Sequence, residues 1–497
     1  MSRSYTALAA TLAALTAPTS AFANCPASMT TAARINCLNT ALNAAVANIT
    51  ALQTANAALE AANADLEAQL ADYATVDYVD SLAFGGGTGS IPHLADYLSV
   101  DTATDSIIFT GANVFVQSGS GATDGTLNGL GNLVVGYNEG AVYLDRSGSH
   151  NLVVGRNHTY SSYGGTVFGV GNKVAGPYSV VLGGTGSTAE GWYSSVSGGY
   201  ANWASVDGSS VSGGYSNKAT GYNSSVTGGD ENEAFGEYSS VTGGRRNHAN
   251  GTYSSVSGGA DNVADWESTS VSGGTNNVAY GFATSASGGY GNFAEGDYSW
   301  VAGGSDNYPS GTYSSVCGGK SNTASGDHSS VSGGDGGEAS GAYAWLAGGQ
   351  SNVASGDHAA QSGGQYNIAG GQYASQFGGM YNEASGDYSS ASGGYGNGAS
   401  GDWSSVSGGE SNVATGIVSS TSGGIANWAS GDGSAVSSGY GNQTLGYYAS
   451  VSGGYGNVAN ANFSSVSGGE YNLANGDYSA ILGGNSVTVT ATDGTSP

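Results

Sequence analysis

Two hydrophobic patterns run along this chain, and the first predicts a helical stalk. Between Ile35 and Asp77 the sequence holds neither Gly nor Pro, and apolar side chains recur at alternating steps of three and four residues. Such a seam is typical of a coiled coil. No other segment offers this helix a leucine-rich face, so we expect an oligomeric coiled-coil stalk over 35–83 rather than a lone surface helix. The seam positions are Ile35, Leu38, Leu42, Ala45, Ile49, Leu52, Asn56, Leu59, Asn63, Leu66, Leu70, Tyr73 and Asp77.

Asn56 and Asn63 lie one heptad apart on this seam. Buried Asn fixes the register and the number of chains at a cost in stability, whereas the neutral alternative is a wetter, weaker middle of the coil. The Gly-rich stretch Phe84–Ser90 ends the helix, and residues 84–156 hold short β-like runs such as SIIF and ANVFV. We expect these residues to form a connector between the stalk and the second pattern.

The second pattern is a 15-residue repeat with the consensus N-x-A-x-G-x-Y-S-S-V-S-G-G-x-x. A Gly-Gly pair recurs in 20 of 21 registers from Gly183 to Gly483, and an Asn recurs at the same spacing from Asn157 to Asn472. We call a set of positions separated by whole repeats a column. A flexible linker has no reason to keep columns in step without an insertion, whereas a solenoid does, because each column becomes a ladder along its axis.

Alternation inside the repeat predicts two short strands per coil. N-x-A-x-G and Y-S-S-V-S each alternate with a period of two, so the Ala column and the Val column should point into a thin interior. The Gly-Gly pair suits a positive-φ turn, and the Asn column suits an amide ladder that satisfies turn backbone groups. The expected fold class is all-β, a parallel β-solenoid, and side-by-side trimerisation would deepen its core.

The motif YSSVSGG, followed by N-x-A-x-G, resembles the YadA-like head repeats of trimeric autotransporter adhesins. Asn56 and Asn63 are similar to the seam asparagines of that family's stalks. The resemblance implies a left-handed parallel β-roll over 157–485, a trimeric coiled coil, and adhesion to host or neighbouring-cell glycans or matrix proteins. The chain departs from the family in its 15-residue period and in placing the stalk first. The short tail 486–497 also leaves no room for the family's C-terminal β-barrel anchor.

Charge and targeting signals limit the classes of partner and the cellular location that we expect. Nine basic against 36 acidic side chains give a net charge of -27, which argues against nucleic acid or an anionic membrane as partner. Residues 1–23 carry Arg3, an apolar run and an A-F-A end, which predict a secretory signal peptide before an N-terminal segment at 24–34. We expect export to the surface or exterior of a Gram-negative bacterium, with no transmembrane segment in the mature chain. The three cysteines Cys25, Cys37 and Cys317 leave open a local Cys25–Cys37 bridge or bonds between chains.

The aromatic column of the repeat supplies the candidate binding residues. Tyr, Trp or Phe fills 13 of its 21 registers. The column could bind glycans or another surface, or it could be a stacked ladder that covers an edge between protomers, and the ladder is the favoured interpretation. The candidate binding residues are Tyr193, Tyr238, Tyr253, Tyr298, Tyr313, Tyr343, Tyr373, Tyr388, Trp403, Tyr448 and Tyr478.

Metal binding and catalysis have little support in the sequence. An Asp column precedes the aromatic column, but its copies lack the GGxGxDxUx pattern of calcium-binding β-rolls, so solvated charges are favoured over calcium ligands. His328 and His358 lie two coils apart, too far to share a metal. No Ser is accompanied by a unique His–acid pair. We therefore predict no metal, no cofactor and no catalytic residue, and the chain is not expected to be an enzyme.

The leading hypothesis is an extracellular or cell-surface, adhesin-like structural protein that uses many repeated weak contacts. An ice- or crystal-binding solenoid is the alternative from a different class, although the outward columns vary where ice binders show regular Thr ladders. A secreted glycan-active enzyme is weaker still, for want of acid pairs in a groove.

Overall fold

The computed structural model describes residues 25–73, 94–140 and 142–496 of a chain that forms two compact units, Met1–Val114 and Phe115–Pro497. The expected signal peptide, the end of the heptad seam at Asp77 and the Gly-rich stretch Phe84–Ser90 lie outside the described residues.

The first unit contains the predicted helix, α3 (Thr31–Tyr73). Its run of Ala, Leu and Asn without Gly or Pro favours an uninterrupted helix. Cys25 and Cys37 form a disulfide across Cα atoms 6.0 Å apart, so the bridge is local and ties the residues before α3 to its first turns. No helix in the described part of the chain is long and apolar enough to cross a bilayer.

A small hairpin completes the described part of the first unit. The short helix α5 (Leu94–Tyr97) leads into β1 (Leu98–Asp101), which pairs antiparallel with β2 (Ser106–Phe109). The SIIF run is therefore a strand. The ANVFV run, Ala112–Val116, is not a strand, which corrects that expectation. Its residues find no partner strand, and Phe115 and Val116 instead line a cavity described below.

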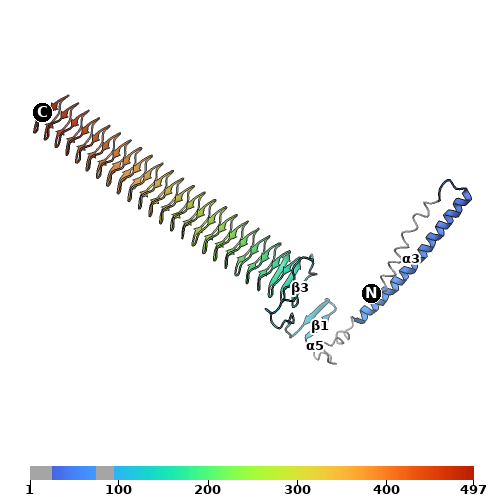
Figure 1. Ribbon diagram of the computed structural model, residues 1–497. Helices are drawn as coiled ribbons and strands as arrows, with labels where there is room; N and C mark the ends of the chain where they lie inside the picture. The colour runs from blue at the N-terminus through green and yellow to red at the C-terminus, as the bar shows by residue number, and fades with distance from the viewer. Residues whose placement is uncertain (1–24, 74–93, 141, 497) are drawn as a thin grey trace. The chain divides into compact units, whose positions relative to one another are not determined.

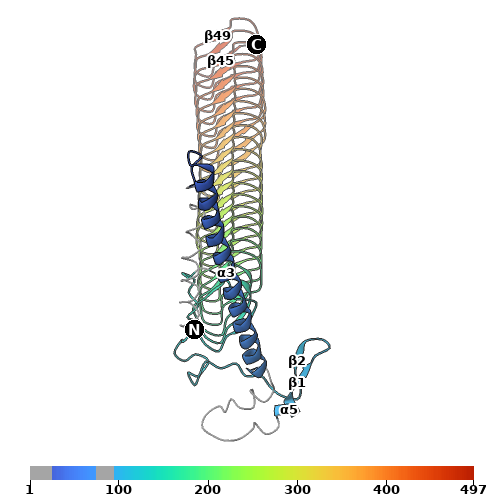
Figure 2. The same cartoon turned by 90° about the vertical axis from the view of Figure 1, so that its right-hand side faces the viewer.

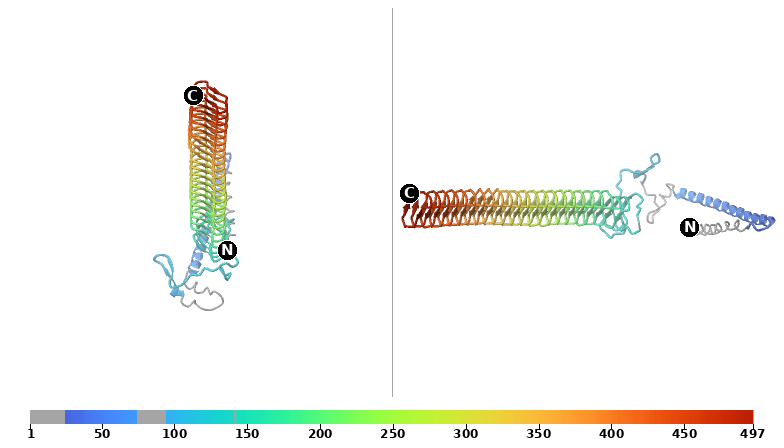
Figure 3. Two further views of the ribbon diagram at one scale, coloured as in Figure 1. Left: turned by 90° about the vertical axis from the view of Figure 1, so that its left-hand side faces the viewer. Right: turned by 90° about the horizontal axis from the view of Figure 1, so that it is seen from above.

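The second unit is a parallel β-solenoid of about 24 turns, seen as a straight stack of coils in Figures 1, 2 and 3. Its first sheet begins with β3 (Leu133–Val135), β4 (Leu152–Arg156) and β6 (Thr166–Val170). Even-numbered strands then follow once per repeat, from β8 (Val180–Val181) to β50 (Thr495–Ser496). Each holds two residues, except the three-residue strands β32 (Ala360–Ser362), β34 (Ser375–Phe377) and β36 (Ser390–Ser392).

The odd-numbered strands form the opposite face of the solenoid. They begin at β5 (Thr159–Tyr160) and recur once per repeat from β7 (Lys173–Val174) to β49 (Thr488–Val489). Hydrogen bonding runs past Pro309, because Phe293 N donates to Asn307 O and Glu295 N donates to Pro309 O. The predicted arrangement of two short parallel strands per coil is confirmed.

The core is the thin interior that the alternation predicts. Val column residues such as Val211 and Val226 and Ala column residues such as Ala219 are at most 1% exposed. Gln361 and Gln376 replace Val in two adjacent coils and share a 3.0 Å hydrogen bond from Gln361 Nε2 to Gln376 Oε1. A typical coil therefore buries two small apolar side chains from the Val and Ala columns, together with an Asn and a Ser.

Stacking extends beyond the repeat bounds expected from the sequence. β3 and β4 pair with each other inside the expected connector. In the expected tail, β49 pairs with β47 (Leu473–Ala474) and β50 pairs with β48 (Ala480–Ile481). The coil between Thr159 and its partner Lys173 is shorter than the later coils, which places His158 rather than Asn157 in line with Asn172. The repeat reaches its constant length only after this coil.

In most Gly-Gly pairs the two glycines have different roles, although both have positive φ at Gly363-Gly364, Gly378-Gly379 and Gly393-Gly394. Gly214, the second of its pair, has φ 91°, and a Cβ there would collide with the carbonyl oxygen of Gly229 in the next coil. A Cβ on Gly213 would meet open space. The conformational demand therefore falls on the second glycine, which explains why Ser438 can replace the first glycine of its pair.

Candidate functional site

The Asn column forms the predicted amide ladder at one turn of the coil. Asn232 Nδ2 donates to Gly228 O and to Gly244 O, both at 2.9 Å, and Asn232 Oδ1 accepts the N–H of Asn247 at 3.0 Å. One buried side chain therefore satisfies backbone groups in its own coil and in the next. The same pattern recurs along the stack, which makes this column structural.

His158 takes the place of Asn in the short coil that precedes the full-length repeats. Its Nδ1 accepts the N–H of Asn172 at 3.2 Å, and its Nε2 lies 3.1 Å from Val154 O, four residues earlier, as Asn Nδ2 does elsewhere. These contacts fix the neutral Nε2–H tautomer of a side chain that is 1% exposed. Burial lowers the pKa of His158 below its ordinary value. This role does not follow from the sequence, because a strict period aligns Asn157 with the column.

The aromatic column lies at the opposite turn, where the backbone is left-handed. Tyr343 has φ 59° and is 53% exposed, and the other candidate binding residues are also exposed with φ between 53° and 61°. Bulky residues rarely adopt this conformation. The sequence pattern assigned the aromatic residue to a strand, whereas the strand holds only the Ser-Val dipeptide that follows it.

Eight consecutive rings in this column stack without a break, and we call them the aromatic ladder. Neighbouring ring centroids are 4.1–5.0 Å apart, and the rings are tilted by no more than 14° from one another. Two imidazoles continue the stack between tyrosines, so the run is longer than the count of Tyr, Trp and Phe suggests. The aromatic ladder consists of Tyr298, Tyr313, His328, Tyr343, His358, Tyr373, Tyr388 and Trp403.

The remaining candidate residues form shorter stacks. Tyr238 stacks on Tyr253 at 5.1 Å, and Phe463 continues a stack between Tyr448 and Tyr478. Tyr193 stacks on Tyr178 at 5.4 Å. The structure therefore brings the candidates together in separate groups, because small or aliphatic residues interrupt the column at Gly208, Asn223, Ser268, Ala283, Val418 and Gly433.

No protein-family model matches the chain, and no curated protein matches it either. Function is therefore inferred from the fold and from its exposed columns.

The Asp column has a backbone role that the sequence did not reveal. Asp357 Oδ1 accepts the N–H of Ala342 in the preceding coil at 3.0 Å, and Asp297 Oδ1 accepts that of Phe282 at 2.9 Å. Asn462 does the same for Tyr447, so an amide can replace the carboxylate. Among the described residues, no group of three His, Cys, Asp or Glu side chains is placed to hold a metal ion.

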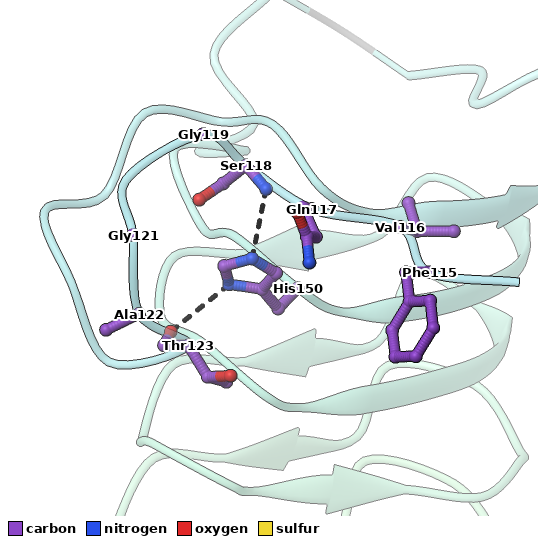
Figure 4. Close-up of a pocket in the computed structure, with 9 residues that line it drawn as sticks. All are labelled: Phe115, Val116, Gln117, Ser118, Gly119, Gly121, Ala122, Thr123 and His150. Carbon is purple, nitrogen blue, oxygen red and sulfur yellow. Dashed lines mark hydrogen bonds between the residues drawn. The ribbon is translucent and has the colours of Figure 1, made fainter.

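The solenoid begins beside a cavity of about 480 Å³ formed by a loop that wraps around His150 (Figure 4). His150 Nε2 accepts the N–H of Ser118 at 3.0 Å, and Nδ1 lies 3.2 Å from Thr123 O. Both ring nitrogens are therefore engaged by the backbone, and the imidazole holds the loop rather than offering a free nitrogen to a ligand.

Proposed function

We propose that this chain is an exported, adhesin-like structural protein that attaches to other surfaces through its β-solenoid. The observation that carries this proposal is one exposed edge along which aromatic rings recur in successive coils, with carboxylates beside some of them. Contacts that are individually weak become strong when many act together on a rigid spacing. At about 4.8 Å per coil, the stack offers a contact edge roughly 110 Å long.

The proposal includes a trimer assembled through α3. Its seam residues are between 40% and 64% exposed in the single chain, namely Ile35, Leu38, Leu42, Ile49, Leu52, Leu59 and Leu66. An exposed leucine seam of this length is unfavourable in water and is buried when helices associate. Asn56 donates from Nδ2 to Glu60 Oε1 at 2.8 Å in the single helix, and we expect it to face its counterparts in the trimer.

Export is proposed from the leader-like residues 1–23 and is supported by the disulfide between Cys25 and Cys37. Disulfides persist in oxidising compartments such as the periplasm and the cell exterior.

Light scattering and cell-binding assays on the chain without residues 1–23 test both parts of the proposal. We expect a trimer that binds cells, matrix proteins or glycans, and a Leu52→Asp/Leu59→Asp variant that is monomeric and binds about a hundredfold more weakly through lost avidity. The matched control is Ala51→Asp/Ala58→Asp on the same helix, which adds the same charges at the same spacing but off the seam. A monomeric wild-type chain would overturn the stalk, and thermal hysteresis in cooled solution without cell binding would favour the ice-binding alternative.

A further inference from the structure

Most rings of the aromatic ladder have no free face for a ligand. Each internal ring is covered on both faces by neighbours at 4.1–5.0 Å, so a sugar or another flat group can meet only its edge. The two end rings are the exceptions. Tyr298 is followed outward in the column by Ala283 and is met edge-on by Phe282 at 5.3 Å, whereas Trp403 is followed by Val418. Trp403 is 58% exposed, compared with 43% for Tyr388 beneath it. The ladder therefore offers a long ridge of ring edges that ends in one indole platform.

A regular row of carboxylates runs beside this ridge. Asp297, Asp327, Asp357 and Asp387 occupy every second coil, so they recur about every 10 Å. The Oδ1 atom of each accepts a backbone N–H from the preceding coil, at 2.9–3.1 Å, which fixes the side chain and leaves an exposed second oxygen. At the end of the row, Asp402 adds a carboxylate beside Trp403. We call the ladder and these five aspartates the Asp–aromatic strip.

The negative charge of the Asp–aromatic strip is not balanced nearby along the chain. Lys320 is the last Lys or Arg in the sequence, and it belongs to the opposite turn of its coil. Residues 321–497 contain twelve Asp and Glu and no Lys or Arg. A ridge whose only basic side chains are His328 and His358, against five carboxylates, attracts a partner of positive charge.

We propose that the Asp–aromatic strip binds an extended cationic glycan, a β-1,4-linked polymer of glucosamine lying parallel to the solenoid axis. The two-coil spacing of the carboxylates is close to the length of one disaccharide unit in such a polymer, so alternate ammonium groups can meet successive aspartates. Trp403 lies at the end of the strip, where its exposed indole favours a nearby cation. This inference deepens the proposed function and rests on it.

The spacing distinguishes a glycan from a basic peptide. Side chains on one face of an extended peptide recur about every 6.8 Å, so they fall out of phase with carboxylates about 10 Å apart. A Lys-rich strand could therefore pair with only some of the aspartates, whereas the amino-sugar polymer can pair with each of them. Because the carboxylates are already held by the backbone, little side-chain freedom is lost on binding.

Calorimetry of the full-length protein with a glucosamine hexamer tests the inference. The comparison ligands are its fully N-acetylated counterpart, a cellulose hexamer and a poly-L-lysine of similar charge. We expect the glucosamine hexamer to bind at least about tenfold more tightly than each of these three, and to lose affinity as salt is raised. Tryptophan fluorescence should change on binding in the wild type and not in a Trp403→Phe variant.

A triple variant, Asp327→Asn/Asp357→Asn/Asp387→Asn, separates charge from structure. Asn462 shows that an amide keeps the backbone hydrogen bond at this column, so the fold should be retained. We expect about a tenfold loss of hexamer binding or more. The control, Asp335→Asn/Glu338→Gln/Glu410→Gln, removes the same charge from other columns and should bind within about twofold of wild type.

Three results would overturn the inference: equal binding of the N-acetylated hexamer, equal binding of poly-L-lysine, or equal loss in both triple variants. Attachment to cells without hexamer binding would also overturn it and would leave the proposed function standing. Hexamer binding by a protein that neither trimerises nor attaches to cells would support the strip and would overturn the proposed function.

Discussion

At the scale of single residues, we expect substitutions in the Asn column to cost the most free energy of unfolding. Asn232→Ala removes the partners of Gly228 O and of the Asn247 N–H, and one of the two donors to Gly244 O, which keeps the Asp230 N–H. Buried backbone groups left without a partner are costly, so we expect a loss of about 2–4 kcal/mol in the free energy of unfolding. Urea unfolding followed by circular dichroism measures it.

Ser239 provides the matched control in the same coil. Its hydroxyl is buried without a hydrogen-bond partner, and Ala already occupies this column at Ala344 and Ala359. Ser239→Ala should therefore change the free energy of unfolding by less than about 0.5 kcal/mol, or raise it. If both substitutions had equal effects, the Asn ladder would not be the source of the difference.

At position 343 we expect Gly to give a more stable protein than Ala, which is the reverse of their usual ranking. Both Tyr343→Ala and Tyr343→Gly lose the stacking on His328 and His358, but only Ala keeps the strain of a Cβ at φ 59°. We expect the Gly variant to be more stable by about 1 kcal/mol, as measured by chemical unfolding. Gly208 and Gly433 show that the column accepts glycine. A more stable Ala variant would mean that the turn relaxes out of the left-handed region.

His158 makes the first coils sensitive to acid. Burial lowers its pKa in the folded chain, while the unfolded chain titrates near the ordinary value of about 6.5. The stabilising effect of the neutral ring is therefore complete above about pH 6.5 and is lost as the pH falls from there towards the lower folded pKa. Hydrogen exchange at the Asn172 amide, corrected for intrinsic rates, should report this loss.

The control for this pH effect is His158→Asn, which restores the residue of the column. We expect it to keep both hydrogen bonds and to remove the acid sensitivity between pH 7.5 and 5.5. If His158→Asn retained the same acid sensitivity, the effect would have to arise from other groups.

Residues differ in how far the sequence predicted them. The inward Val and Ala columns and the Asn ladder followed from spacing alone, because burial and amide bonding repeat with the coil. The left-handed aromatic turn did not, since propensity places Tyr in strands and tertiary packing overrode it. The sequence also did not predict that Asp357 accepts the Ala342 N–H. Every residue except Pro has a backbone N–H, so the identity of residue 342 does not indicate this hydrogen bond.

At the scale of the element, the coil is the unit of stability. Deleting Asn247–Asp261, which is one whole repeat, joins Arg246 to Asn262 and leaves every column in register. Each coil contacts only its neighbours, so we expect a folded rod with a nearly unchanged melting temperature that is shorter by about 5 Å. Small-angle scattering and thermal unfolding measure the two quantities.

A deletion of half a coil is the control. Removing Asn247–Tyr253 places residues of one strand opposite residues of the other and breaks the Val and Ala columns. We expect loss of the neighbouring coils and a clear drop in melting temperature, because a shifted register exposes the core face. Equal tolerance of both deletions would contradict a column-based account of the fold.

At the scale of the whole molecule, the sequence predicted the order of the elements better than their limits. The 15-residue period identified the solenoid, but β3 and β4 lacked the consensus and were assigned to the connector. The sequence predicted the candidate binding residues as one column. It did not predict that they form separate stacked groups. The spacing of His328 and His358 argued against a shared metal, but it did not predict that they continue the stack between Tyr313, Tyr343 and Tyr373.

The lack of Lys and Arg after Lys320 also affects how the molecule is degraded. Proteases that cut after basic residues find no site in residues 321–497, whether that region is folded or not. Digestion by such an enzyme would remove the stalk and the first coils and would release the distal part of the Asp–aromatic strip as one fragment. In a protease-rich surrounding, the surface proposed to hold the glycan would therefore be the last part to be cut.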